Sequence, residues 1–301
     1  MSLCEGRVAI VTGAARGLGR AHALALAAAG AAVVVNDYGV ALDGTGADTG
    51  PAQQVVDEIV AAGGRAVANG DDVADWAGAQ RLVQTALDAF GRLDVLVNNA
   101  GFLRDRMLAN LGEDEWDAVV RVHLKGHFAP MRHAAAHWRA ESKAGRRPDA
   151  RVINTSSGAG LFGSVGQGNY SAAKAGIATL SVVAAAEFGR YGVTVNAIAP
   201  AARTRMTEQA FADTMAAPAD GGFDAMAPEN VSPLVVWLAS AESKDVTGRV
   251  FEVEAGRITV ADGWQRGPAA DKGARWDPAE LGPVVTDLLA EAPAPVPVYG
   301  A

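Results

Sequence analysis

The feature that most limits how this chain can fold is a short apolar strand that runs directly into a glycine-rich loop. Arg7–Thr12 has the pattern of the strand, TGAARGLG at 12–19 forms the loop, and an Ala/Leu-rich helix follows to Ala29, with Gly30 as its stop. Glycines let a loop approach a pyrophosphate, whose charge then lies at the helix N-terminus. Glycine spacing alone is weak evidence in a chain with 35 Gly, but the flanking strand and helix indicate a dinucleotide site.

Strands and helices alternate along the rest of the sequence, which is typical of an α/β fold. We expect further strands at Val33–Asn36, Ala66–Ala68, Leu93–Val97, the run ending at Ile153, Val193–Ile198 and Val250–Val253. We expect helices at Ala52–Ala62, Glu113–Arg139, Tyr170–Gly189 and Val231–Ser240. The catalytic domain is predicted to span 1–263, with a substrate lid at about 203–228. A tail, 264–301, with a short helix near Pro278–Ala290, is expected to pack on or near that domain, its last stretch extended or disordered.

The stretch NTSSGAGLFGSVGQGNYSAAKAG at 154–176 carries the candidate chemistry. Tyr170 opens an alanine-rich, helix-favouring segment, so Lys174 lies one turn on, on the same helix face. A nearby ammonium favours the phenolate, and bringing a tyrosine from its usual pKa towards neutrality takes about 3 units, or roughly 4 kcal/mol. Ser157, at a strand end, can hold a substrate oxygen beside that phenol. The alternative is a surface Tyr–Lys pair, because YxxxK also arises by chance.

Together with TGAARGLG and with NNAG at 98–101, this stretch closely resembles the short-chain dehydrogenase/reductase family, over roughly residues 5–260. The resemblance implies a single-domain, three-layer αβα fold built on a Rossmann-type doubly wound parallel sheet, and a nicotinamide cofactor. It implies Ser157 as substrate-oxygen donor and Tyr170 as acid/base. Lys174 would bind the ribose and lower the pKa of the tyrosine.

The adenosine half of the cofactor is expected at the first two strands. The pyrophosphate loop comprises Gly13, Arg16, Gly17, Leu18 and Gly19. Asp37, at the end of the second strand, would accept hydrogen bonds from the ribose and repel a 2′-phosphate, which favours NAD over NADP. Arg16 is the counter-evidence, since a cation there could hold a 2′-phosphate, and a turn-forming role is the alternative for Asp37.

Other cofactor contacts follow from the resemblance. Asp72 would contact adenine, with Asp71 as a near rival and Val73 completing the Asp–Val pair. The turn Asn99, Ala100, Gly101 would line the nicotinamide and ribose, beside Pro200, and Thr204 could reach the carboxamide. The glycine-rich connection 38–51 is long enough to be a flap near the adenosine or a tolerated insertion.

His123 departs from the common family pattern, in which an Asn at this place is thought to hold a water of the proton relay. A histidine can also relay a proton, but it titrates near pH 6.5, whereas the amide does not. Packing is the alternative. His123 and His127, and His133 and His137, have one-turn spacing. No carboxylate motif accompanies either pair, so no metal site is predicted.

Two arginines lie past the carboxyl end of the strand before NNAG, at the edge where open α/β sheets bind ligands. Arg104 and Arg106 could therefore contact the substrate, and structural ion pairs with Asp105 or other neighbours are the alternative. The basic segment 139–151 leads to the amino end of a strand, the wrong edge for an active site. A solvated loop is expected there.

Several stretches resemble a narrower group, the (3R)-hydroxyacyl-CoA dehydrogenase part of multifunctional β-oxidation enzymes, among them VNDYG, RVHLKG and GQGNYSAAKAG. His123 is shared with that group. The resemblance implies NAD-linked oxidation of a (3R)-3-hydroxyacyl-CoA, with a separate enoyl-CoA hydratase as a metabolic neighbour. One alternative is a dehydrogenase of a free steroid, terpenoid or other secondary alcohol. A second is a non-catalytic NAD-binding scaffold, against which the intact Ser157, Tyr170 and Lys174 argue.

Composition excludes some partners. The net charge of −8 argues against non-specific nucleic-acid binding. A single cysteine, Cys4, excludes an internal disulfide and favours a reducing compartment. We see neither a membrane-spanning run nor a signal peptide, and expect a cytoplasmic protein. By family resemblance the helices Glu113–Arg139 and Tyr170–Gly189 would form the two-fold interface of a homodimer or homotetramer.

Overall fold

The computed structural model describes the chain apart from residues 1, 40–49, 205–216, 219–220, 262 and 301. In the described part, eight strands form one sheet in the order β3-β2-β1-β4-β5-β6-β7-β8. All neighbouring pairs are parallel except β7 and β8. The strands are β1 Val8–Thr12, β2 Ala32–Asn36, β3 Arg65–Asn69, β4 Val95–Asn98, β5 Ala150–Thr155, β6 Val193–Ala201, β7 Val250–Glu254 and β8 Arg257–Ala261.

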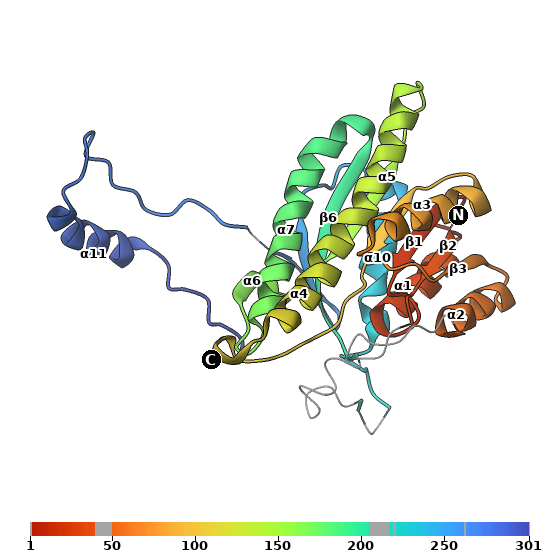
Figure 1. Ribbon diagram of the computed structural model, residues 1–301, viewed down its shortest axis with the longest axis horizontal. Coiled ribbons are helices and arrows are strands. Elements are labelled where there is room, and N and C mark those ends of the chain that lie inside the picture. The colour runs from red at the N-terminus through yellow and green to blue at the C-terminus, as the bar shows by residue number, and fades with distance from the viewer. Residues whose placement is uncertain (1, 40–49, 205–216, 219–220, 262, 301) are drawn as a thin grey trace.

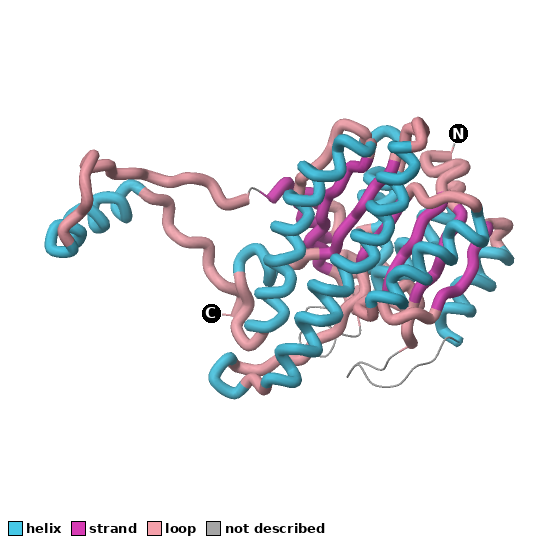
Figure 2. The backbone as a smooth tube through the Cα atoms, turned by 45° about the horizontal axis from the view of Figure 1, so that its top comes forward, coloured by secondary structure: helices cyan, strands magenta, loops and turns pink. Residues whose placement is uncertain are grey.

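Helices cover both faces of this sheet and give the three layers that the sequence predicts (Figure 1, Figure 2). The α-helices are α1 Gly17–Ala28, α2 Gly50–Ala61, α3 Trp76–Phe90, α4 Glu113–Val120, α5 Gly126–Lys143, α6 Gly158–Phe162, α7 Gly168–Phe188, α10 Ser232–Ala239 and α11 Leu281–Glu291. Alternate residues of β1 point to opposite faces. Val11 packs in an apolar core with α1, α2 and α10, and Ile10 packs in a second core with α3, α5 and α7. The predicted single-domain α/β fold is confirmed.

The strand order places the functional loops together. β1 lies between β2 and β4, so the chain reverses its direction of sheet growth at β1. Ligands of doubly wound sheets bind outside the carboxyl ends of the strands at such a switch point. The glycine loop after β1, the Asn99 turn after β4 and Ser157 after β5 all meet at this edge.

The predicted helix Glu113–Arg139 is interrupted. α4 ends at Val120, a π-helical turn covers Arg121–Lys125, and α5 continues to Lys143. A π-turn inserts one extra residue into the helix and changes the direction of the side chains around it. Here it contains His123, whose side chain is directed into the protein and is 1% exposed. Hydrophobic periodicity does not reveal an insertion of one residue, so the sequence predicts one unbroken helix.

The sheet extends one strand beyond the last one predicted. The expected Val250–Val253 is β7, and β8 returns antiparallel to it through Ala255 and Gly256. Ala255 has φ 51°, in the left-handed region that tight hairpin turns require. An Ala-Gly pair is a weak turn signal, because alanine rarely adopts that region. β8 therefore escapes detection from the sequence.

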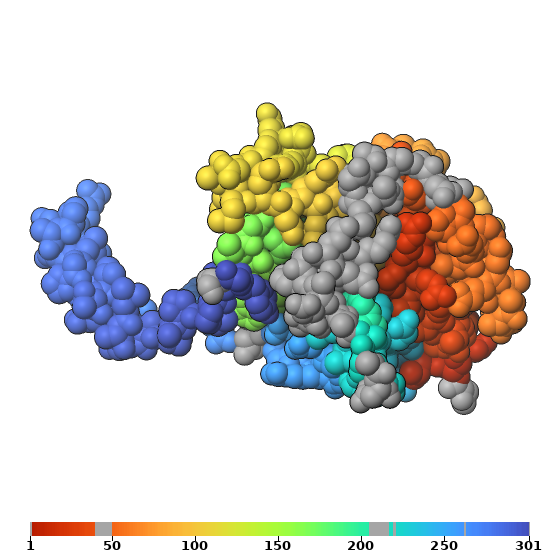
Figure 3. Space-filling view, turned by 90° about the horizontal axis from the view of Figure 1, so that it is seen from below, coloured from red at the N-terminus to blue at the C-terminus, as the bar shows by residue number. Residues whose placement is uncertain are grey.

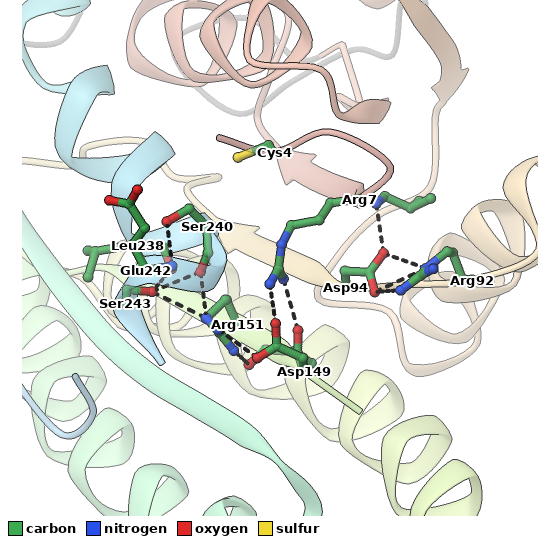
Figure 4. Close-up of polar contacts among 12 residues, drawn as sticks. Cys4, Arg7, Arg92, Asp94, Asp149, Arg151, Leu238, Ser240, Glu242 and Ser243 are labelled. Atoms are coloured by element: carbon green, nitrogen blue, oxygen red, sulfur yellow. Dashed lines mark hydrogen bonds and ion pairs between the residues drawn. The ribbon is translucent and has the colours of Figure 1, made fainter. Parts of the chain in front are cut away.

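At the amino end of the sheet, charged side chains form a network instead of a binding site (Figure 4). Asp149 pairs with Arg7 and, at 2.6 Å, with Arg151 of β5. The Arg151 side chain is 2% exposed and also donates from Nε to the Ser240 oxygen at 3.0 Å. Earlier in the predicted basic loop, Arg146 pairs with Glu141. The basic residues of this segment are thus partly neutralised in place.

The carboxyl-terminal tail leaves the domain as an arm. In Figure 1 and Figure 3 the segment around α11 stands apart from the layered body, and the chain then returns so that its end lies near α6. No residue of α11 is buried. The expected helix near Pro278–Ala290 is present as a 3₁₀ turn, Pro278–Glu280, followed by α11. Residues 298–300, near the end of the tail, contact the domain closely.

In the described part of the chain, one helix is long and apolar enough to span a membrane by length and composition, Gly168–Tyr191, which comprises α7 and the turn after it. This is weak evidence, because core helices pass the same test. α7 packs on β6 and α6 within the layered fold.

Candidate active site

The glycine loop has no room for side chains at Gly13 and Gly19. A Cβ on Gly19 would lie 2.1 Å from the Gly13 oxygen, and a Cβ on Gly13 would lie 2.8 Å from Ala100 Cα. Gly17 has φ 51° and opens α1, with Arg16 at the N-cap and Leu18 packed against the core. Within the described residues, the Arg16 side chain makes no capping hydrogen bond to the start of α1. The N–H groups of this helix start and the close backbone fit the diphosphate of a nicotinamide dinucleotide.

Thr12, which sequence reasoning left without a role, joins this loop to the turn after β4. Its hydroxyl accepts hydrogen bonds from the N–H groups of Asn99 at 2.9 Å and Ala100 at 3.1 Å. The Asn99 amide in turn donates to the main-chain oxygens of Thr12 at 2.9 Å and Gly13 at 3.2 Å. The structure thus brings the predicted loop and the predicted NNAG turn together. The signal that was available is the threonine that opens TGAARGLG.

Asp37 lies at the end of β2 beside the glycine loop, as expected. Its Oδ2 accepts a hydrogen bond from Ala15 N at 3.0 Å, and its Oδ1 accepts one from Gly39 N at 2.8 Å. The carboxylate therefore stands at the edge of the loop in a fixed position. The Arg16 side chain is exposed. Residues 40–49 of the long connection lie outside the described residues.

Asp71 and Asp72 follow β3, and each is held by an arginine. Asp72 pairs with Arg121 at 2.6 Å and accepts from Ala74 N at 2.8 Å. Asp71 pairs with Arg81 at 2.6 Å. Val73 is buried in the core that includes α3 and α5. The geometry brings both carboxylates to the carboxyl edge of the sheet and does not choose between them.

Ser157, Tyr170 and Lys174 come together at the carboxyl end of β5. Ser157 caps α6, its Oγ accepting from Ala159 N at 3.2 Å. Burial raises the pKa of Tyr170, and a hydrogen bond with the Ser157 side chain opposes that shift. The Lys174 Nζ lies 5.5 Å from the Tyr170 ring centroid and donates to the Thr155 oxygen at 2.6 Å. The predicted constellation is therefore assembled.

The electrostatics of this constellation differ from the expectation that Lys174 lowers the pKa of Tyr170. Lys174 is 2% exposed, and burial lowers its own pKa to about 7. Burial therefore disfavours the charged ammonium form of Lys174. Desolvation is the largest influence on the pKa of Tyr170, and it disfavours the phenolate. In this state of the protein, Tyr170 is a neutral phenol.

Asn169 was missed by the sequence analysis and positions this tyrosine. It is fully buried, and its Oδ1 accepts from Tyr170 N at 2.8 Å. Its Nδ2 donates to the Arg104 oxygen at 3.1 Å and the Glu115 oxygen at 3.3 Å. The start of α7 is thereby tied to the loop after β4 and to α4. The position directly before Tyr170 was the only sequence signal.

His123 lies against Tyr170, with ring centroids 5.1 Å apart and an interplanar angle of 85°. Its Nε2 is 2.6 Å from the Phe102 oxygen. A Cβ on Gly101 would lie 2.1 Å from the His123 Cε1, so the glycine of NNAG makes room for this ring. Burial lowers the pKa of His123 to about 3. The expectation that it titrates near pH 6.5 is wrong, because the closed environment disfavours the imidazolium.

The two candidate substrate arginines are placed differently. Arg106 forms a two-pronged ion pair with Glu115, with an Nη2–Oε1 distance of 2.7 Å. Arg104 lies over the Phe102 ring, its Cζ 5.8 Å from the centroid. The alternative of a structural ion pair therefore describes Arg106, with Glu115 as its partner instead of Asp105. Asp105 accepts a hydrogen bond from Gln167 at 2.8 Å.

A cavity of about 850 Å³ opens beside Ser157 and Tyr170. Pro200 of β6 forms part of its wall, and so do Tyr299 and Gly300 at the end of the chain. This volume can hold an extended organic molecule. The tail therefore contributes to the pocket, a point that the sequence leaves open.

The region expected to be a lid, 203–228, is described in part, since 205–216 and 219–220 lie outside the described residues. Arg203 pairs with Asp224, and Met226 lines the cavity. Thr204 lies beside the glycine loop, its Cγ2 3.6 Å from the position of a Cβ on Gly17. Thr204 is thus next to the site proposed for the cofactor.

Both histidine pairs lie on α5 or the π-turn before it. Among the residues that the structure describes, no group of three His, Cys, Asp or Glu side chains could hold a metal ion. His133 instead packs edge-on against Trp76, with ring centroids 4.6 Å apart.

Comparisons with known proteins agree with this geometry. A family model described as short chain dehydrogenase matches residues 7–215. The hydroxyacyl-CoA dehydrogenase ChsB1 of Mycobacterium tuberculosis is 48% identical over 294 residues, which cover 95% of this chain and 89% of that protein. The crystal structure of a short chain dehydrogenase from Mycobacterium avium is 69% identical, with a TM-score of 0.90, and covers 99% of this chain and 100% of that one.

A longer relative matches only in part. The peroxisomal multifunctional enzyme type 2 of Mus musculus is 45% identical over 254 residues, which cover 84% of this chain and 32% of that enzyme. This chain therefore spans about a third of the multifunctional relative. The fold, the assembled Ser157–Tyr170–Lys174 site and the family match lead to one conclusion: the chain belongs to the short-chain dehydrogenase family and is an oxidoreductase that acts on CH–OH groups with a nicotinamide cofactor.

Proposed function

We propose that this protein oxidises a (3R)-3-hydroxyacyl-CoA to the 3-ketoacyl-CoA with NAD. The observation that carries the proposal is the 48% identity to a hydroxyacyl-CoA dehydrogenase over 95% of the chain. The assembled Ser157, Tyr170 and Lys174 support it, since a non-catalytic scaffold has no need for them. The cavity of about 850 Å³ beside these residues offers room for an acyl chain.

The three residues have distinct roles in the proposed reaction. The bound nicotinamide supplies the hydride acceptor. Tyr170 Oη first loses its own proton to solvent and, as the phenolate, takes the proton of the substrate hydroxyl. Ser157 Oγ holds the same oxygen by a hydrogen bond. Lys174, next to the tyrosine and tied to the Thr155 oxygen, binds the cofactor ribose and stabilises the phenolate while it exists. His123 packs against the phenol and keeps water from that side of the ring.

NAD is the proposed cofactor because a carboxylate, that of Asp37, lies at the end of β2 beside the glycine loop. Asp37 is fixed by the Ala15 and Gly39 N–H groups and would repel a 2′-phosphate. The glycine loop, the Asn99–Gly101 turn, Pro200 and Thr204 form the rest of the proposed cofactor site. Asp72 and Asp71 flank the adenine end, beside Val73.

Arg104 is the proposed contact for the CoA phosphates. It lies past the carboxyl end of β4, at the edge of the sheet that holds the site. Arg104→Ala should raise KM for a CoA ester far more than for a CoA-free analogue. An equal effect on both substrates would remove this role. Arg106 serves as the control, because its guanidinium is already paired with Glu115.

A second copy of the chain is the proposed partner, in a homodimer or homotetramer. Phe128 of α5 and Val182 and Val183 of α7 are exposed by 41%, 50% and 47%. Phe128 and Val183 line two hollows on the α5 and α7 surface, and a homodimer would cover them. Sedimentation of wild type and of Val183→Glu tests this: a monomeric wild type contradicts it.

We further propose that a separate enoyl-CoA hydratase supplies the substrate. The name of the multifunctional relative supports this proposal, because it describes an enzyme in which more than one activity is combined. A hydratase adds water to an enoyl-CoA and yields the 3-hydroxyacyl-CoA that this site would oxidise.

The decisive experiment measures reduced cofactor with (3R)- and (3S)-hydroxyacyl-CoAs, free steroids and simple secondary alcohols, each with NAD and with NADP. Turnover confined to (3R)-hydroxyacyl-CoAs with NAD is expected. Activity on a free alcohol with none on any CoA ester would favour the alternative substrate class. A preference for NADP would contradict the role of Asp37 and favour that of Arg16.

A further inference from the structure

The last residues of the chain are bound to the loop that follows α6. The Tyr299 main-chain oxygen accepts a hydrogen bond from Val165 N at 2.9 Å. The Tyr299 N–H donates to the Gly163 oxygen at 3.2 Å. These two bonds make a short parallel bridge between Tyr299 and Ser164. The end of the chain is therefore anchored by its main chain, as an added strand would be.

The Tyr299 side chain reaches inward from this bridge. Its ring meets the Phe162 ring edge-on, with centroids 6.1 Å apart and an interplanar angle of 83°. A Cβ on Gly158 would lie 2.8 Å from the Tyr299 hydroxyl oxygen. Gly158 directly follows Ser157, so the phenol of Tyr299 occupies the space next to the residue that holds the substrate oxygen.

The surroundings of Tyr299 differ in polarity across the cavity of about 850 Å³ that it lines. Leu103, Phe162 and Met226 line it with apolar groups, while Glu252 and Glu254 lie on its β7 side. Burial, followed by the charges of these two glutamates, raises the pKa of Tyr299. Tyr299 is thus an uncharged part of the cavity wall. Arg257 of β8 lines the same cavity, so this side carries charges of both signs.

We propose that residues 298–300 form one wall of the substrate pocket and that the Tyr299 ring limits the bulk of the substrate group next to Ser157. For a hydroxyacyl-CoA this group is the acyl chain, and that identification rests on the proposed function. The proposal that Tyr299 forms a wall does not depend on the proposed function, since any alcohol held by Ser157 would meet the same ring. Tyr299 acts as a specificity-determining residue, with no part in proton or hydride transfer.

The test compares kcat/KM for (3R)-hydroxyhexadecanoyl-CoA with that for (3R)-hydroxybutanoyl-CoA, in Tyr299→Ala and in a chain ending at Pro297. Each should raise the ratio of long to short substrate by about tenfold, a typical effect of removing one steric contact in a binding pocket. KM for NAD should not change. Tyr299→Phe keeps the ring and should keep the wild-type ratio. Val296→Ala is the matched control, because its side chain is 61% exposed on the same arm.

An unchanged ratio of kcat/KM for the long and short substrates, in both Tyr299→Ala and the shortened chain, would contradict the proposal that residues 298–300 form a wall of the pocket. The shortened chain retains the whole layered domain, and its thermal unfolding verifies that it is folded. If the wild type oxidises no hydroxyacyl-CoA but does oxidise a free alcohol, the proposed substrate class is wrong. The wall is then tested by the same ratio between a large and a small alcohol, and an unchanged ratio again overturns it.

Discussion

At the scale of single residues, Tyr170 is the group on which the proposed chemistry depends. Its phenol is hydrogen-bonded to Ser157, and Lys174 stands beside its ring. Positioned acid–base groups contribute about 10²–10⁴ in rate. Tyr170→Phe should lower kcat by roughly that factor and leave the affinity for NADH within about threefold, as one hydroxyl among many cofactor contacts is lost. Single-turnover kinetics and fluorescence titration measure the two. Retained kcat would assign the proton transfer to another group.

His123 leads to a different expectation at the same scale. Its pKa of about 3 keeps the ring neutral throughout the range in which the enzyme would be assayed. His123→Asn should therefore leave the shape of the pH–rate profile between about pH 5.5 and 8 unchanged, because no titration is removed. A change in the kcat of His123→Asn at a single pH would instead reflect the altered packing against Tyr170. A flattened acid limb in the variant would show that the histidine does titrate during turnover.

At the scale of elements, the strand–loop–helix unit of β1 and α1 has no spare space at Gly19. A Cβ there would meet the Gly13 oxygen at 2.1 Å, so Gly19→Ala must displace the loop. Overpacking of this kind costs about 1–3 kcal/mol, which corresponds to a roughly 5- to 150-fold loss of NADH affinity when the strain falls on the binding loop. Gly189→Ala is the control, since nothing lies within 4 Å of a Cβ at that position. Calorimetric titration with NADH compares them, and equal affinities would contradict the close packing.

The strand ends opposite the active site support a prediction about stability. Asp149 neutralises Arg7 and the buried Arg151, whose side chains are 10% and 2% exposed, whereas its own side chain is 54% exposed. Asp149→Asn should lower the free energy of unfolding by about 2 kcal/mol, less than for a fully buried pair because water reaches the carboxylate. Glu141→Gln breaks the outer pair with Arg146 and should change it by less than about 0.5 kcal/mol. Urea unfolding of both variants measures these changes. A larger loss of unfolding free energy in Glu141→Gln than in Asp149→Asn would contradict the prediction.

For the whole molecule, the sequence predicted what depends on neighbours along the chain. The glycine loop, the strand ends at Asp37 and Asn99, and the spacing from Tyr170 to Lys174 all follow from local geometry and charge. The structure differs from the sequence-based prediction where contacts between distant segments determine the local conformation. The π-turn at His123, the extra strand β8 and the return of Tyr299 to the pocket depend on long-range packing. Burial also changed the expected pKa of His123, because a sequence does not show which side chains lose their water.

Three buried histidines, His22 of α1 and the neighbouring His123 and His127, predict how stability depends on pH. Burial lowers the pKa of His22 and of His123 to about 3, and that of His127 well below its usual value. Unfolded histidines titrate near 6.5, so between about pH 3 and 6.5 the unfolded chain binds more protons and stability falls as the pH falls. His22 and His123 should each lower the free energy of unfolding by about 1 kcal/mol between pH 7 and 5.5, and His127 should act in the same direction.

The measurement is urea unfolding at those two pH values for wild type and for His22→Gln. His22 packs between α1 and α10, where its Nδ1 lies 2.9 Å from the Ser232 hydroxyl. Glutamine can keep a hydrogen bond to that hydroxyl and does not titrate. The variant should lose about 1 kcal/mol less than the wild type on acidification, whatever its stability at pH 7. An identical loss in both proteins would mean that His22 takes up a proton in the folded state as readily as in the unfolded one.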